Sequence, residues 1–184
     1  VELQCKVRNW KAYDIAYWES YGITLPWLKW AEVYPISHKI VIKNGVRHLF
    51  GAAKHAYAFV EHKENHTTIK IYQPFVKEYK WTNGHNGSVI SLWSKIPKTG
   101  ERLFITSSLK DALNLSCQLH IPAIAPQGEG YSLSSSAVQE LKRRYKQIIV
   151  FFDNDFAKSS NPGRLRSKIL CAKHGFSRIE IPDE

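Results

Sequence analysis

Two aspartates separated by one residue form the strongest chemical signal in the sequence. Asp153 and Asp155 directly follow Gln147–Phe152, the most hydrophobic strand-like stretch of the chain. Side chains two positions apart in an extended segment point the same way, so both carboxylates can face one site. Mg²⁺ takes oxygen ligands of this kind. The pattern therefore favours a divalent metal site. The alternative is that Asp153, Asn154 and Asp155 simply end a strand and begin a turn.

The elements that must position these acids follow Gly100, where strand-like and helix-like segments alternate with short connections. That alternation is typical of parallel βαβ units. In such sheets ligands gather at the carboxyl ends of the strands, which is where both aspartates emerge. We expect strands at 102–106, 122–125, 147–152 and 177–181, and helices at 108–120, 134–145 and 162–174.

The first hundred residues have a different pattern. Apolar residues recur at three- and four-residue spacing over 10–18 and 24–33, which predicts two short helices. Thr24 is a suitable N-cap for the second, and Pro26 is tolerated in its first turn. Alternating apolar and polar residues then predict a partly exposed antiparallel sheet. We expect its strands at 39–43, 56–60 and 68–72, with a tight turn at Asn44-Gly45.

Composition and charge narrow the class of protein. Among the 184 residues, 26 Lys and Arg against 16 Asp and Glu leave a net charge of +10, which points to a polyanionic partner, with nucleic acid first. The three cysteines are far apart, with no C-x-x-C, and no H-E-x-x-H occurs, so neither a zinc site nor a disulfide framework is expected. No apolar run is long enough to cross a membrane, and we expect a cytoplasmic protein.

Three segments of the second region resemble the TOPRIM domain of DnaG-type and phage primases, over roughly residues 98–184. They are Leu103–Leu113, Pro122–Gly130 and Ile148–Ala157. In that family a strand, a catalytic Glu and a Gly precede a helix that begins Lys-Asp-Ala, as Lys110-Asp111-Ala112 does here. The second family motif, D-x-D-x-A-G, is matched from Asp153 through Ala157. The upstream region, including Tyr17–Ile23, is similar to the N-terminal subdomain of these primases.

The resemblance implies a two-part architecture. It predicts an α+β N-terminal subdomain at residues 1–99, followed by an α/β TOPRIM domain at residues 100–184 with a central, mostly parallel sheet flanked by helices. The change between the parts would fall near the turn Pro97-Lys98-Thr99-Gly100.

The sequence departs from the family at its first motif, where Ser107 holds the Glu position and Ser108 the Gly position. Glu129 lies in a loop at the carboxyl end of the second expected strand, with a glycine on each side. We therefore predict that Glu129 replaces the missing acid as a catalytic group and metal ligand. The spacing of Ser108 and Asp111 also has a structural explanation, because it is that of a capping box at the start of a helix.

Several basic residues are candidates for contact with nucleotide or DNA. Lys110, in the first turn of a helix, is unfavourable to the helix dipole unless an anion lies nearby. Lys70, Lys77 and Lys80 alternate with aromatic residues, which suits single-stranded DNA or an RNA–DNA hybrid, although an ordinary cross-strand aromatic set would look the same. Arg164 belongs to a basic run on the helix expected at 162–174.

The leading hypothesis is the catalytic core of a DNA primase of phage or mobile-element type. Asp153, Asp155 and Glu129 would hold two Mg²⁺ (or Mn²⁺) ions, and the enzyme would copy a single-stranded DNA template into short RNA primers from nucleoside triphosphates. A replicative helicase would be a possible partner. The alternatives are a catalytically impaired nucleic-acid-binding module and a TOPRIM nuclease.

Overall fold

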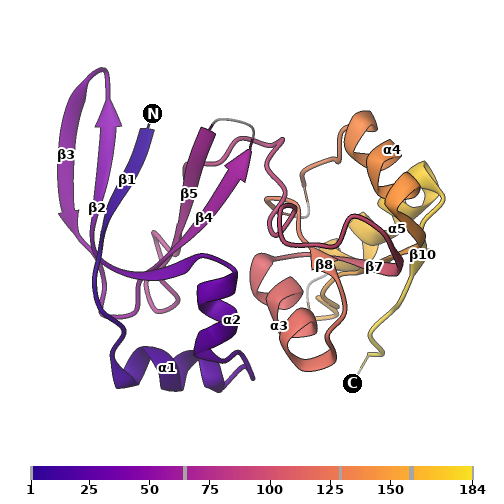
Figure 1. Ribbon diagram of the computed structural model, residues 1–184, viewed down its shortest axis with the longest axis horizontal. Helices are drawn as coiled ribbons and strands as arrows, with labels where there is room; N and C mark the ends of the chain where they lie inside the picture. Colours follow the sequence, from indigo (N-terminus) through magenta and orange to yellow (C-terminus); the bar gives the residue numbers. More distant parts are fainter. Residues whose placement is uncertain (1, 64–65, 129, 158–159, 184) are drawn as a thin grey trace. The chain divides into compact units, whose positions relative to one another are not determined.

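A computed structural model describes residues 2–63, 66–128, 130–157 and 160–183 (Figure 1). Contacts within the chain group it into two compact units, Val1–Asn86 and Gly87–Glu184. Residues 87–99, which the sequence analysis assigned to the first region, thus belong to the second unit. The physical reason is that Ile90, Trp93 and Ile96 pack against the core of that unit.

The first unit contains two helices and an antiparallel sheet. The helices are α1 (Ala12–Glu19) and α2 (Leu25–Trp30), and the strands are β1 (Glu2–Val7), β2 (Val33–Lys43), β3 (Val46–Gly51), β4 (Tyr57–Lys63), β5 (His66–Tyr72) and β6 (Trp81–Asn83). The sheet order is β1-β2-β4-β5-β6, with β3 paired to β2. The long β2 pairs with β4 at its start, and its remainder lies between β1 and β3.

Local sequence accounts for much of this unit. Asn44 and Gly45 both have positive φ (52° and 77°), as a tight hairpin turn requires, so the predicted turn between β2 and β3 is confirmed. Thr24 is the N-cap of α2, as expected. Trp18 of α1 is completely buried and lies against the rings of Tyr57 and Phe59 on β4, which anchors the helix to the sheet.

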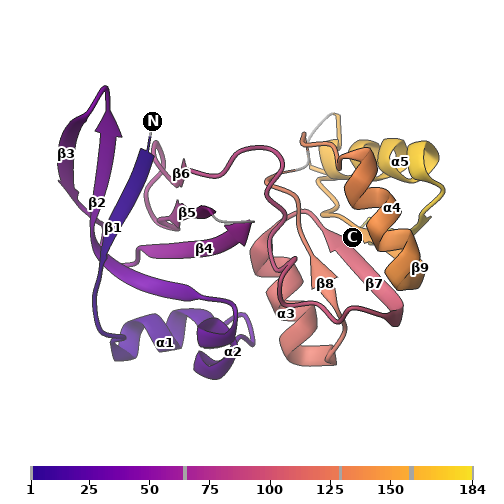
Figure 2. The same cartoon turned by 45° about the horizontal axis from the view of Figure 1, so that its top comes forward.

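The second unit is a four-stranded parallel sheet with helices on both faces. Its strands are β7 (Gly100–Thr106), β8 (Ala123–Ile124), β9 (Tyr145–Phe151) and β10 (Ser177–Arg178), and its helices are α3 (Leu109–Leu119), α4 (Ser135–Arg144) and α5 (Pro162–His174). The order is β10-β9-β7-β8, and every pair is parallel, which confirms the predicted βαβ pattern. Helix α3 covers one face, and α4 and α5 the other (Figures 1 and 2).

The core of the second unit lies between the sheet and helices α4 and α5. Alternate residues of β7 and β9 contribute Leu103, Ile105, Ile148 and Val150, which meet Leu141 of α4 in one buried cluster. The helices of this unit end within one residue of the expected ranges, whereas α2 of the first unit ends at Trp30, before the expected 33, because Val33 begins β2. Helix α5 covers the expected range 162–174, and its C-cap is Gly175 in the left-handed region, with φ of 69°.

The register of the central strands places the ends of two strands side by side. Thr106, the last residue of β7, pairs with Phe151, the last residue of β9. The residues that follow these strands, Ser107 and Asp153 among them, therefore emerge at the same edge of the sheet. In the described part of the chain, no helix has the length and apolar character that crossing a bilayer requires.

Candidate active site and nucleic-acid interface

Acidic side chains from two elements converge at the carboxyl edge of the parallel sheet. Asp153 and Asp155 follow β9, and Asp111 lies in the first turn of α3, directly after β7. The negative charges of Asp111 and Asp155 raise the pKa of Asp153, and the positive charge of Lys110 lowers it. We refer to Asp111, Asp153 and Asp155 together as the acidic rim. The structure places the predicted pair at this edge, after β9, and its role in binding a metal stays a prediction.

The surroundings of Asp153 within the acidic rim disfavour its charged form. The pKa of Asp153 is raised, first because neighbouring atoms displace part of its hydration and then because Asp111 is close by. Asp155 adds to this effect, while a hydrogen bond with Ser107 and the charge of Lys110 oppose it. A carboxylate whose charge is disfavoured in this way gains stability from a cation, which is the electrostatic requirement of a metal site.

Two serines hold Asp111 in place at the start of α3. Ser108 is the N-cap residue, and its hydroxyl oxygen accepts a hydrogen bond of 3.3 Å from the backbone N–H of Asp111. Its hydroxyl group in turn donates to the carboxylate of Asp111. Ser107 donates to the same carboxylate oxygen at 3.2 Å. Of the predicted capping box, the bond from the backbone N–H of Asp111 to Ser108 is confirmed.

The turn that carries Asp153 and Asp155 is held by two asparagines. Asn161, the N-cap of α5, accepts a hydrogen bond from the backbone N–H of Asp155 at 3.1 Å and donates to Asn154 at 2.6 Å. Asn154 donates to the carbonyl oxygen of Ile181 and to the carboxylate of Asp183. The C-terminal segment is thereby tied to the residue between the two rim aspartates.

The donor set fits a hard divalent cation but is not assembled as a complete ligand shell. Within the described ranges, no three His, Cys, Asp or Glu side chains come together closely enough to hold a metal ion. Glu129, the predicted third acid, lies outside the described residues. The structure instead brings Asp111 to the rim. In the sequence, Asp111 is identifiable as a capping residue and as part of a family motif; its place in the first turn after β7 is the signal that could identify it as a site residue.

The predicted basic residues of the second unit have different surroundings. Lys110 is close enough to Asp153 for its charge to lower the pKa of that carboxyl group. Arg164 forms ion pairs with Asp183 at 2.8 Å and with Glu180 at 3.4 Å, so its charge is largely compensated by the C-terminal segment. Contact of either residue with nucleic acid remains a prediction.

A stacked aromatic pair with two lysines forms a distinct surface on the first unit. The rings of Tyr72 on β5 and Trp81 on β6 stack with centroids 4.3 Å apart, and Trp81 is 40% exposed. The ammonium group of Lys70 lies 4.7 Å from the centre of the Trp81 ring, and that of Lys80 lies 5.9 Å from the Tyr72 ring. Aromatic surface beside cations suits stacked bases and phosphates. We call these four residues the aromatic–lysine surface.

Burial modifies two side chains beside this surface. The pKa of Lys70 is lowered, because burial removes part of the hydration of its ammonium group. The pKa of His85 falls to about 4, because the ring is buried and the positive charge of Lys70 is near. His85 is therefore neutral at physiological pH, and the charge at this surface comes from the lysines.

The other residues predicted to share this surface lie elsewhere in the unit. Phe75, which is 68% exposed, packs edge-on against Tyr17 and His55. The ammonium group of Lys39 lies over the ring of Tyr79, 5.5 Å from its centre. Lys77 is exposed. The structure thus brings Lys70 and Lys80 together around one aromatic pair, whereas the remaining aromatic residues belong to other clusters.

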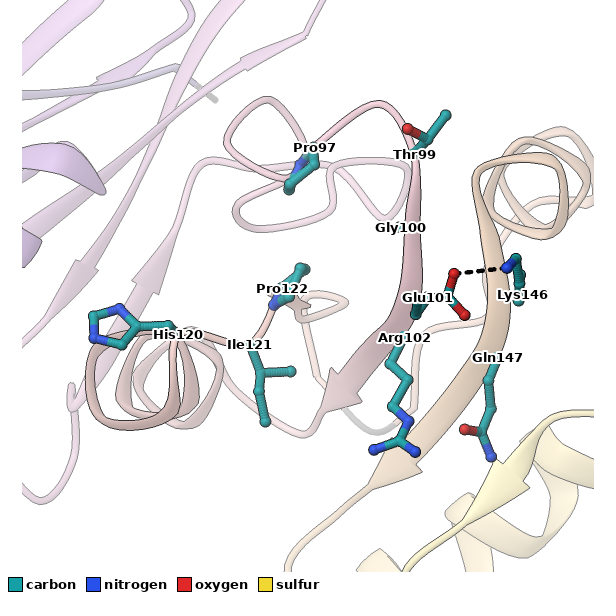
Figure 3. A pocket seen from close by; sticks show the side chains of 10 residues that line it. All are labelled: Pro97, Thr99, Gly100, Glu101, Arg102, His120, Ile121, Pro122, Lys146 and Gln147. Atoms are coloured by element: carbon teal, nitrogen blue, oxygen red, sulfur yellow. Dashed lines mark ion pairs between the residues drawn. The ribbon is translucent and has the colours of Figure 1, made fainter.

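A hollow of about 680 Å³ opens at the opposite edge of the parallel sheet, where the strands begin (Figure 3). It is lined by residues at the starts of β7 and β9 and by the segment before β8, including Arg102, His120 and Pro122. The ion pair of Glu101 and Lys146, at 2.6 Å, lies on its wall. The acidic rim lies at the other edge of the sheet, because its residues follow the carboxyl ends of β7 and β9.

Comparisons with known proteins are informative at the level of structure. No family model and no curated protein sequence matches the chain. A DnaG primase catalytic domain bound to single-stranded DNA is similar with a TM-score of 0.65 and 12% identity, covering 92% of this chain and 66% of that one. The Aquifex aeolicus primase, with its zinc-binding and RNA polymerase domains, has a TM-score of 0.66 and 13% identity over 94% and 50% of the two chains.

A phage protein is also similar. The primase fragment of the bacteriophage T7 primase-helicase protein has a TM-score of 0.55 and 16% identity, covering 98% of this chain and 66% of that one. The chain therefore spans between half and two thirds of the length of these three structures. At such low identity the likeness establishes the fold, which is that of a DnaG-type primase catalytic core.

Proposed function

We propose that this chain is the catalytic core of a DNA primase that joins nucleoside triphosphates into short RNA primers on single-stranded DNA. The observation that carries the proposal is the acidic rim, which lies at the carboxyl ends of β7 and β9 within a DnaG-type primase fold. Carboxylates at the edge where such sheets bind ligands are the kind of group that could hold the divalent cations of phosphoryl transfer.

The acidic rim would hold divalent cations, for which Mg²⁺ and Mn²⁺ are the candidates. Bound there, such ions would neutralise phosphate charge and favour attack by a primer hydroxyl group. Asp153 and Asp155 would bind them directly, and Asp111 is the described acid best placed to assist. The predicted ligand Glu129 remains part of this proposal. Lys110 would contribute positive charge toward a triphosphate at the amino end of α3.

The aromatic–lysine surface would bind the template strand. Trp81 presents a ring on which a base can stack, while Lys70 and Lys80 are positioned for phosphate groups. The similar DnaG primase catalytic domain bound to single-stranded DNA supports a single-stranded partner, and another similar structure is a fragment of a primase-helicase. A helicase partner is proposed on the same basis.

A second candidate function is a nucleic-acid-binding module without catalytic activity. One observation favours it: the acids of the described residues do not form a ready-made metal cluster. Such a module would bind single-stranded DNA through the same aromatic–lysine surface but would show no metal-dependent chemistry. The two functions therefore differ in one measurable property.

The experiment that decides between them is primer synthesis on single-stranded DNA with labelled ribonucleotides, with Mg²⁺, with Mn²⁺ and with excess chelator. We expect alkali-labile products that depend on template and on the divalent cation. DNA binding without products under any of these conditions would support the non-catalytic module, and shortening of the template would indicate a nuclease.

A further inference from the structure

Strand β3 forms an open edge of the first unit. Within the described ranges it pairs with β2 alone, and Figures 1 and 2 show it on the outer side of the hairpin, away from β1. An antiparallel strand bonds to one neighbour through every second residue, so the remaining N–H and C=O groups of β3 point away from β2. Its register with β2 is continuous and it contains no proline, so neither a bulge nor a missing N–H interrupts this edge.

Both faces of β3 are open as well. All six of its residues are exposed, and the apolar ones among them, Val46, Leu49 and Phe50, are exposed by 56%, 55% and 47%. Because side chains alternate along a strand, Val46 and Phe50 share one face and Leu49 lies on the other. An uninterrupted edge with apolar side chains on both faces is a surface to which a further strand can add.

The charge of the hairpin has one sign. No Asp or Glu occurs in the sequence between residues 32 and 61, whereas Arg47 lies on β3 and two lysines, Lys39 and Lys43, lie on the paired part of β2. A strand with acidic side chains would place them beside Arg47, where opposite charges attract across the ladder. A second copy of this chain would bring like charges together, which disfavours self-pairing at β3.

The side chains of this edge favour a polypeptide over a nucleic acid. Val46 and Leu49 have no ring on which a base can stack. The ring of Phe50 already lies under the ammonium group of Lys39, which is 5.9 Å from its centre and 5.5 Å from the centre of the Tyr79 ring. The edge therefore offers main-chain hydrogen bonds and aliphatic contact, which are the interactions of an added strand.

We propose that β3 is the docking edge for an acidic, extended segment of a partner protein, which adds to the sheet as a further strand. The main chain of that segment would bond to the outward N–H and C=O groups of β3. Its apolar side chains would cover Leu49 and Phe50, and its carboxylates would lie beside Arg47. This edge is distinct from the aromatic–lysine surface on β5 and β6, and the inference does not depend on the proposed catalytic activity.

Selection of short random peptides displayed on phage, with the full chain as the target, tests the proposal. The enriched peptides are sequenced, and fluorescence anisotropy measures the affinity of each for the wild type and for variants. Leu49→Ser removes an apolar contact, and Arg47→Glu reverses a charge. The matched controls are Leu119→Ser, at a leucine that is 59% exposed on α3, and Lys29→Glu, an exposed change on α2. Thermal unfolding measures whether each variant folds.

We expect the enriched peptides to alternate apolar and acidic residues. Leu49→Ser and Arg47→Glu should each weaken peptide binding about 10- to 100-fold, because one loses buried apolar area and the other repels the carboxylates of the peptide. The two control variants should bind as the wild type does. Amide hydrogen exchange of β3 should slow in the complex, since its outward N–H groups become bonded. Binding of single-stranded DNA should be unchanged in Leu49→Ser.

Enrichment of no acidic peptide would overturn the proposal, as would equal peptide affinity of the wild type and the two β3 variants. Self-association that Leu49→Ser abolishes would identify a second copy as the occupant instead, and loss of DNA binding in Leu49→Ser would identify nucleic acid. If Leu49→Ser fails to fold, the comparison of Arg47→Glu with Lys29→Glu decides the matter. Failure of primer synthesis with intact, β3-dependent peptide binding would refute the proposed function and leave this inference standing.

Discussion

The carboxylate of Asp153, after β9, lies near that of Asp111, in the first turn of α3, and the two repel each other. They meet because β7 and β9 are neighbours in register, which brings the end of one strand beside the helix that follows the other. A fold that places like charges together loses stability there, and such arrangements are typical of functional sites. The acidic rim therefore leads to predictions for stability as well as for activity.

Replacement of Asp153 by Asn should stabilise the protein at neutral pH. The pKa of Asp153 is raised on folding, by lost hydration first and by Asp111 second, so its ionised form is disfavoured in the folded state. This cost is present at pH values above the folded-state pKa and disappears below the unfolded-state pKa. Thermal unfolding should show a modestly higher midpoint for Asp153→Asn at neutral pH, with the difference vanishing in acid. An equal or lower midpoint at neutral pH would contradict the repulsion.

The opposite behaviour is expected for Asp14 in the first unit. Asp14 is fully buried and accepts hydrogen bonds from Arg8 at 2.6 and 2.9 Å and from Tyr57 at 3.0 Å. Although burial alone would raise its pKa, these bonds and that from the backbone N–H of Lys11 lower it. Breaking a buried ion pair costs about 3–5 kcal/mol, so Asp14→Asn should reduce the free energy of unfolding by that order.

The pH dependence provides the check on Asp14. A lowered pKa contributes stability above the unfolded-state value, and that stability is lost as the pH falls through the folded-state value. The difference between wild type and Asp14→Asn in denaturant unfolding should thus be largest at neutral pH and should narrow in acid. Glu19→Gln, at the exposed end of the same helix, serves as the control and should change little. A gap that is constant with pH would show that the ion pair is not its origin.

Trp81 should contribute to binding of single-stranded DNA by stacking on a base. We expect Trp81→Ala to weaken binding by about 1–3 kcal/mol, the usual range for one base–aromatic stack. Trp30 is a suitable control, because it is 38% exposed, compared with 40% for Trp81, and lies on α2 against Trp27. Fluorescence anisotropy with a labelled oligonucleotide measures both. Equal losses for Trp30→Ala and Trp81→Ala would remove the aromatic–lysine surface as the binding site.

Lys80 should contribute one phosphate contact to the same complex. The logarithm of affinity for a single strand falls with the logarithm of salt concentration by about 0.7 for each phosphate neutralised. Lys80→Ala should therefore lower that slope by about 0.7, whereas Lys29→Ala, an exposed change on α2, should leave it unchanged. An unchanged slope for Lys80→Ala would exclude a phosphate contact at this residue.

Features that depend on a few neighbouring residues could be predicted from the sequence. The cap formed by Ser108 and Asp111, the turn at Asn44-Gly45 and the end of α5 at Gly175 each follow from side-chain chemistry within four residues. The parallel order of the second sheet also follows, because alternating strands and helices allow few other arrangements. The acidic pair Asp153 and Asp155 could be predicted because both residues lie directly after one strongly apolar strand.

Features that depend on contacts between distant segments could not be predicted. All six residues of β3 are exposed, so this strand lacks the alternating buried face by which a strand is recognised. The separation of Phe75 and Tyr79 from the Tyr72–Trp81 stack depends on how the segment between β5 and β6 folds back. Likewise, the pairing of Arg164 with Asp183 requires the C-terminal segment to return to α5.

The most direct test of the central claim compares primer synthesis by the wild type and by the Asp153→Asn/Asp155→Asn double variant. Labelled ribonucleotides, single-stranded DNA and Mg²⁺ are supplied, and folding and DNA binding of both proteins are measured alongside. We expect the wild type to make RNA primers and the double variant to make none, although it folds and binds DNA normally, because two rim carboxylates have lost their charge. Undiminished synthesis by a folded double variant would contradict the assignment of the acidic rim as the catalytic site.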